Sequence, residues 1–199
     1  MWTNLVSFIG AVLLFRFVLN EAVVFKFTNF ECKSYNLSWF VFHNYRLKAV
    51  SRDRVLLNMN GTVLHPVNNI QLHAKILKKA NGFKPWILES TVDACRFMRK
   101  RYDPFTIIVY NIFKEFTNIN HTCPYVVSYS KSVSTLNLVI IILLQGPQIV
   151  KDFYLKSELL ILPFPSGEYM LTMQWHFHSK RQFDTNVSFI YMEDLLKRN

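Results

Sequence analysis

The sequence predicts a mainly β fold built around an antiparallel sheet, with a helical insertion at about residues 91–117. Several stretches alternate apolar and polar residues with the two-residue period of a strand that has one covered face. Residues 91–117 instead repeat apolar residues at helical spacing. The 199-residue chain is 51% hydrophobic and 16% aromatic, so it can bury a large core and is not expected to be disordered. Because no Gly/Ser linker or internal repeat divides it, we expect a single domain over residues 23–199.

The first 22 residues are typical of a secretory signal peptide. An apolar run from Leu5 to Phe15 is too short to span a bilayer comfortably, and Ala22 is a small residue suited to cleavage. Two details are irregular, since no Lys or Arg precedes the run and Arg16 interrupts it. We therefore expect a secreted, extracellular protein, with an uncleaved N-terminal signal anchor as the alternative.

The first half of the mature chain contains four strand patterns. Residues 22–32 and 37–57 have weak alternation, and the second stretch is broken near Arg52 and Asp53. In IQLHAKIL, residues 70–77, the apolar residues occupy alternate positions and define one face. A short pattern follows at residues 86–89. These stretches indicate strands of a half-buried sheet.

Two helical patterns then follow each other. In STVDACRFMRKR, residues 90–101, Ser90 precedes Asp93 by three residues, which is a loose variant of the capping box. Asp103-Pro104 interrupts the pattern. The next stretch repeats apolar residues at amphipathic spacing, at Phe105, Ile108, Val109, Ile112, Phe113 and Phe116.

The last third of the chain returns to strands. An aliphatic run over residues 138–144 is too short for a membrane span, so we interpret it as a buried strand with a turn at Gly146-Pro147. EYMLTMQWHFH, residues 168–178, has the clearest alternation in the chain. A weaker strand is expected at residues 186–192.

Three cysteines are present, and none has the spacing of a structural zinc site. In an oxidising compartment the economical assignment is one disulfide and one leftover thiol. Cys95 and Cys123 bracket the helical insertion, so we expect them to pair and Cys32 to be a free thiol. His121 lies two residues before Cys123, but a catalytic pair needs a third, orienting group that the sequence does not supply.

Sequons for N-glycosylation occur four times, which together with the signal-like start favours the secretory pathway. The expected glycosylation sites are Asn36, Asn60, Asn120 and Asn186.

Several classes of function are excluded mainly because the sequence lacks their motifs. The net charge of +10 gives a weak attraction to anionic surfaces, but the basic residues are not interleaved with aromatics, so we expect no nucleic-acid partner. No nucleotide-binding glycine pattern or nucleophile motif is present. We therefore expect no enzyme activity, no metal and no cofactor. The sequence indicates no oligomeric state.

Five motifs together resemble a known family. They are FTNFEC at 27–32, RLKAVSR at 46–52, NGFKPWILESTVDACRF at 81–97, NINHTCPY at 118–125 and LPFPSGEYML at 162–171. In this order they resemble a secreted insect family, expanded in Drosophila, that is catalogued as a domain of unknown function. That family is similar in turn to ML lipid-recognition domains and to chemosensory proteins of pheromone perception. Tyr45 stands where the family usually carries a further cysteine, and residues 126–149 are longer than its pattern.

The resemblance implies an immunoglobulin-like antiparallel β-sandwich or cup whose apolar interior admits a lipid, and it implies no catalytic residues. We therefore expect a secreted binding protein for a small hydrophobic ligand, such as a lipid, hydrocarbon or pheromone. The alternative is an extracellular interaction or receptor-accessory glycoprotein with a solid core. Apolar pockets need few polar groups, and the expected pocket residues, which core packing would also select, are Trp86, Tyr169, Leu171, Met173, Trp175 and Phe177.

Overall fold

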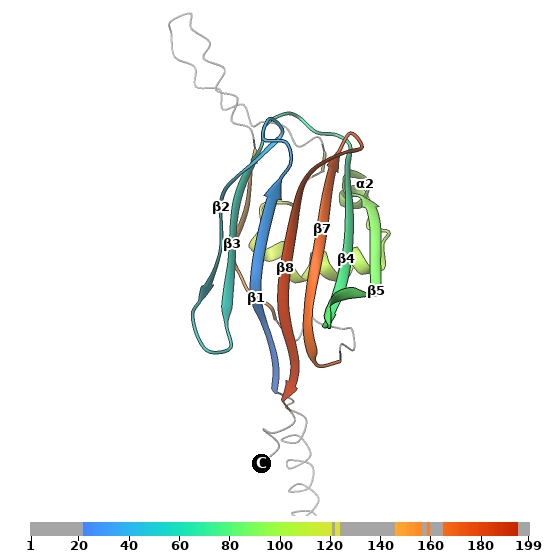
Figure 1. Ribbon diagram of the computed structural model, residues 1–199. Coiled ribbons are helices and arrows are strands. Elements are labelled where there is room, and N and C mark those ends of the chain that lie inside the picture. Colours follow the sequence, from blue (N-terminus) through green and yellow to red (C-terminus); the bar gives the residue numbers. More distant parts are fainter. Residues whose placement is uncertain (1–21, 121, 124–145, 157–158, 160–164, 195–199) are drawn as a thin grey trace, which may run out of the picture.

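The structure consists of two antiparallel sheets packed as a sandwich (Figure 1). It is a computed structural model that describes residues 22–120, 122–123, 146–156, 159 and 165–194. One sheet has five strands in the order β1-β8-β7-β4-β5, and the other has three in the order β2-β3-β6. The mainly β, sandwich-like fold is therefore confirmed. The signal segment up to residue 21 and the aliphatic run at 138–144 lie outside the described residues.

The elements follow the chain in a simple order. They are β1 (Ala22–Ser34), β2 (Phe40–Ala49), β3 (Val55–Val63), β4 (Ile70–Ala80), β5 (Gly82–Asp93), α2 (Ala94–Arg99), α3 (Pro104–Phe113), the 3-10 turn η1 (Lys114–Phe116), β6 (Pro147–Phe153), β7 (Gly167–Phe177) and β8 (Lys180–Asp194).

The two sheets differ in width, and the helices cover the part of the larger sheet that the smaller sheet leaves free. The three-stranded sheet lies against the β1 side of the larger sheet, and α2 and α3 lie against its β4–β5 side. Figure 1 shows α3, in yellow-green, crossing behind the five-stranded sheet. No helix in the described part of the chain is long and apolar enough to cross a membrane.

A β-bulge in β1 keeps three phenylalanines on the inner face. Phe25 and Phe27 are paired with β8 in regular alternation, and the register then shifts between Phe27 and Asn29. A bulge inserts one extra residue and so reverses the alternation after it. Phe30 therefore joins Phe25 and Phe27 among the residues that line the interior.

The β7–β8 hairpin turns on two residues with left-handed backbone, His178 at φ 49° and Ser179 at φ 65°. Left-handed backbone at both positions is what a two-residue hairpin needs, although Asn and Gly are its usual residues. Contacts to two other loops hold this turn. The His178 amide donates to the carbonyl of Asn69, between β3 and β4, at 3.2 Å. The His178 ring lies 5.7 Å from that of Trp39, between β1 and β2.

The helical insertion lies over residues 94–116, close to the predicted range, but its first cap differs from the prediction. Asp93 caps α2 by accepting from the Arg96 amide at 2.9 Å, whereas Ser90 belongs to β5. The sequence reading placed the cap three residues early, because β5 runs directly into the helix and Ser90 is still in the strand. Asp103 caps α3 by accepting from the Thr106 amide at 2.7 Å.

The strand predictions were right in place and often short in length. Strands predicted at 86–89 and 186–192 extend over 82–93 and 180–194. Strand β6 was missed, and Pro147 is its first residue rather than part of a turn. Proline is tolerated at the first residue of a strand, so the Gly146-Pro147 pair was misleading as a turn signal.

A stack of aromatic rings joins the two sheets near one end. Phe40 of β2 is 1% exposed, and its ring lies 3.9 Å from that of Phe183 of β8. The ring edge of Phe40 also packs against Gly61 in β3, where an added Cβ would lie 2.6 Å from Phe40 Cζ. Only a glycine leaves room for the ring at this position.

A disulfide bond links the two ends of the helical segment. Cys95 of α2, which is 1% exposed, forms a disulfide with Cys123, with 5.3 Å between their Cα atoms. The two residues are 28 positions apart, so the bridge encloses both helices. This is the pairing expected from the sequence.

Replacing Gly61 by alanine should destabilise the sandwich by about 1 to 3 kcal/mol, because the new methyl group displaces Phe40 from its stack. The matched control is Gly146→Ala, where the Cβ meets only Gln148 Nε2 at 3.8 Å. The midpoint of urea denaturation measures the stability of both variants. Equal midpoints for the two variants would contradict the packing role of Gly61.

Removing the disulfide with the double change Cys95→Ala and Cys123→Ala should cost roughly 3 to 4 kcal/mol of unfolding free energy, because the unfolded chain regains the freedom of a 29-residue loop. Cys32→Ala is the control, since Cys32 is a free thiol. Calorimetric melting of the three proteins tests this. A double variant as stable as the control would show that the bridge does not hold the helices.

Candidate ligand cavity

A cavity of about 240 Å³ lies between the two sheets and α3. Its walls come from β1, β2, β3, β4, β5, β6, β7, β8 and both helices, so it occupies the centre of the sandwich. Protein interiors contain few voids larger than a water molecule. A space of this size inside the core is therefore a feature to be explained.

The floor of the cavity is the inner face of the five-stranded sheet, where cross-strand neighbours form three successive rows. The rows are Leu72–Trp175–Phe183, Ala74–Met173–Thr185 and Ile76–Leu171–Val187. Lining residues on β7 run from Leu171 to Phe177, which corresponds to about 20 Å of strand. The cavity therefore extends along the strands.

Helix α3 forms the opposite wall over part of this length. Its lining side chains include Phe105, Ile108, Val109, Ile112 and Phe113, which are half-buried. An apolar helix face inside a core is normally fully buried against its neighbours. Here these side chains line the cavity and keep part of their surface accessible.

The position of α3 depends on its capped N-terminus. Burial alone would raise the pKa of the Asp103 carboxyl, but hydrogen bonds from the side chain and amide of Thr106 and from Ser90 outweigh it and hold that pKa below its usual value. The carboxylate therefore remains ionised at neutral pH and satisfies the free amide of the first turn. Thr106 itself lines the cavity.

The third wall comes from the smaller sheet. Leu57, Met59 and Val63 of β3 line it together with Val150 and Phe153 of β6. The ring of Phe153 lies 5.1 Å from that of Phe27 on β1, so the two sheets close the cavity at this side.

Four of the six expected pocket residues line the cavity, namely Leu171, Met173, Trp175 and Phe177. Trp86 and Tyr169 do not. Their rings lie 5.4 Å apart, Tyr169 is fully buried, and it also stacks on Phe189 at 5.6 Å. These neighbours fill the space in front of Tyr169, so it packs as core.

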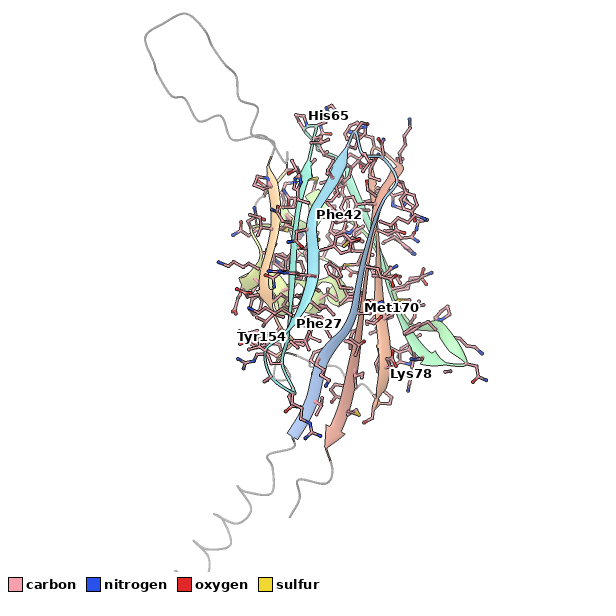
Figure 2. All side chains as sticks on the ribbon, turned by 60° about the vertical axis from the view of Figure 1, so that its left-hand side comes forward. Phe27, Phe42, His65, Lys78, Tyr154 and Met170 are labelled. Atoms are coloured by element: carbon pink, nitrogen blue, oxygen red, sulfur yellow. A yellow bond between two sulfur atoms is a disulfide. The ribbon has the colours of Figure 1, made fainter. Side chains whose placement is uncertain are left out.

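The place of Trp86 follows from an irregularity in β5. The β4–β5 register jumps from Lys75 opposite Glu89 to Leu77 opposite Pro85, so residues 86–88 have no partner on β4. The hairpin leans away from the sandwich near Lys78 (Figure 2). At this bulge the Trp86 ring packs against Tyr169 and does not line the cavity.

Sequence reasoning missed the lining residues of α3 and β8. The β8 set, Phe183, Thr185, Val187 and Phe189, lies on alternate positions of a strand that was predicted too short. The α3 set was visible as an amphipathic pattern. The pattern alone did not say what this apolar face covers. A helix inserted into a β sandwich places its apolar face over the part of a sheet that the other sheet leaves exposed.

Cys32 of β1 is a free and half-buried thiol. Burial raises its pKa to about 12. The thiol is therefore protonated at neutral pH, and a protonated thiol is a poor nucleophile and metal ligand.

The four sequons differ in exposure. Asn60 and Asn120 are exposed, whereas Asn36 and Asn186 are half-buried. The Asn36 side-chain oxygen accepts from the Ser38 amide at 3.2 Å and from its hydroxyl at 2.7 Å. Glycosylation of these residues stays a prediction. His121 lies outside the described residues.

A family model described as "Protein of unknown function (DUF1091)" matches residues 72–171. The matched segment is half of the 199-residue chain and contains most of β4, all of β5, both helices, β6 and part of β7. The chain belongs to this family. No curated protein matches it in sequence.

Among solved structures, the chain is similar to a Niemann-Pick type C2 protein from Japanese carpenter ant. The two are 14% identical over 85% of this chain and 93% of that chain, with a TM-score of 0.28. A likeness this low carries no weight for the function of the chain.

Proposed function

We propose that this member of the DUF1091 family is a secreted, non-enzymatic binding protein that holds one small hydrophobic ligand between its sheets. The observation that carries the proposal is the central cavity of about 240 Å³, lined almost entirely by apolar side chains. Pockets for small ligands are concave and mostly apolar, with a few polar groups.

The energetic cost of the cavity supports a ligand. At about 24 cal/mol per Å³ of closed cavity, an empty space of this volume costs at most roughly 6 kcal/mol of stability. That amount is comparable with the whole net stability of a typical domain, about 5 to 15 kcal/mol. A ligand that fills the space recovers part of the cost by contact with the walls.

The size of the cavity gives a scale for the ligand. Since an apolar cavity of about 150 Å³ takes benzene, one of about 240 Å³ takes a molecule of about ten carbon atoms by proportion. Lipid fragments, hydrocarbons and pheromone-like molecules are in this range. The motif resemblance to a family similar to lipid-recognition domains points the same way.

Secretion is part of the proposal and has separate support. A disulfide that encloses the helical segment is expected to persist in an oxidising compartment. The competing function, an interaction glycoprotein with a solid core, is disfavoured by the cavity, because such a protein gains nothing from the void.

The direct test is to express the protein in a secreting cell, purify it, extract it with organic solvent and analyse the extract by mass spectrometry. We expect an apolar compound in amounts comparable with the protein, absent from a mock preparation. No copurified compound, together with no binding of the ten-carbon fluorescent probe 1-naphthylamine, which is uncharged at neutral pH, would reject the proposal.

A substitution that fills the cavity should weaken ligand binding while it stabilises the fold. Ala74 lies in the middle row of the floor, opposite Met173, and is 5% exposed. In Ala74→Phe the ring occupies ligand space, so we expect affinity for the probe to fall about tenfold, the equivalent of losing roughly two buried methylene groups. The melting temperature without ligand should rise, because a void is filled.

The matched control for this variant is Ala80→Phe on the same strand, where the side chain is exposed at the hairpin tip. It should leave both probe affinity and melting temperature unchanged. Probe binding that is equally tight in Ala74→Phe and the original protein would place the ligand elsewhere.

A further inference from the structure

The cavity walls contain no ionic group among the residues that the structure describes. No Asp, Glu, His, Lys or Arg occurs in the lining. The hydroxyl and amide groups come from Thr106, Tyr110, Gln148 and Thr185. The chemistry offered to a ligand is therefore apolar with a few neutral polar atoms.

Most of those polar atoms are already in use. Thr106 donates to Asp103, and the Tyr110 hydroxyl donates to the Ile119 carbonyl at 3.4 Å. Gln148 uses its amide nitrogen on the Gly146 carbonyl at 3.3 Å, and Thr185 accepts from the Trp175 indole at 3.4 Å. The Thr185 hydroxyl proton is left for a ligand, and a hydroxyl can pair with a neutral oxygen.

Charged side chains of the surrounding elements lie on the outer surface or in pairs with each other. Lys79 pairs with Glu168 at 2.7 Å and Lys156 with Glu115 at 2.7 Å. Further examples are His73 with Glu89, Arg181 with Asp184, the Asp103 cap, and the exposed Arg46, Lys48, Lys84, Lys114 and Lys151.

One cation is stacked directly on a lining residue. The Arg101 guanidinium lies 4.3 Å from the centre of the Tyr110 ring and donates to the Asn111 side chain at 3.4 Å. Arg101 is exposed and is not part of the lining. Because it stacks on a lining residue, Arg101 is the described cation to test as a partner for an anionic head group.

We infer that the cavity selects an uncharged, extended apolar ligand, such as a hydrocarbon or a long-chain alcohol or ester, over an ionised fatty acid. This inference rests on the proposed function. Burying an ionised carboxylate in an apolar cavity without a partner carries a large free-energy cost. A neutral chain has no such cost, and a cavity that extends along the strands accommodates an extended chain.

The test compares 1-decanol with decanoate, which have the same chain and differ in charge. Each is titrated against the neutral probe 1-naphthylamine bound to the full-length secreted protein at pH 6, 7 and 8. Carboxylic acids titrate at about pH 4 to 5, so if only the protonated form enters, the decanoate Kd should rise about tenfold per pH unit. The 1-decanol Kd should stay constant, because no carboxylate, histidine or amine lines the described cavity.

The variant Arg101→Gln completes the test, since it removes the cation over Tyr110 without touching the lining. We expect neither ligand to change affinity. Decanoate binding that matches 1-decanol at pH 8 would overturn the inference while leaving the proposed function intact, and loss of decanoate alone in Arg101→Gln would do the same. If the probe and both ligands fail to bind, the proposed function itself is wrong.

Discussion

The structure depends on the mismatch in width between its two sheets. Five strands present more apolar surface on their inner face than three strands can cover, and exposed apolar surface of that extent is costly in water. The chain covers the remainder with α3, which lies across the β4–β5 side of the larger sheet (Figure 1). A helix lying on a sheet meets it along one stripe of side chains, so the contact between the layers is incomplete. The cavity lies in that incomplete contact, between the helix and both sheets.

Contacts at both ends of its segment hold the helix in place. The Asp103 cap fixes its start, and the disulfide from Cys95 to Cys123 encloses it. Its lining side chains remain half-buried. This arrangement keeps the wall at a distance from the floor, where close packing would otherwise bring the two together. The aromatic stack of Phe40 on Phe183 separately fixes the distance between the sheets.

Sequence periodicity was enough to place most strands and to identify the inner face of β7, because alternation in a half-buried strand follows directly from its geometry. The same pattern could not separate cavity residues from core residues. Tyr169 and Leu171 share one face, yet Tyr169 is enclosed by Trp86 and Phe189 while Leu171 lines open space. That difference comes from a bulge in β5 and from the distance of α3, and neither has a local signal. Strand β6 was missed because its Gly-Pro start is typical of a turn.

The proposed function depends on the apolar cavity between α3 and the floor formed by β4, β7 and β8. Xenon occupies such cavities without needing any specific chemistry. A crystal of the delipidated protein under xenon pressure should show xenon between Val109 of α3 and Met173 of β7, with the surrounding side chains unmoved. A crystal in which α3 packs directly on Met173 and no xenon binds there would contradict the account.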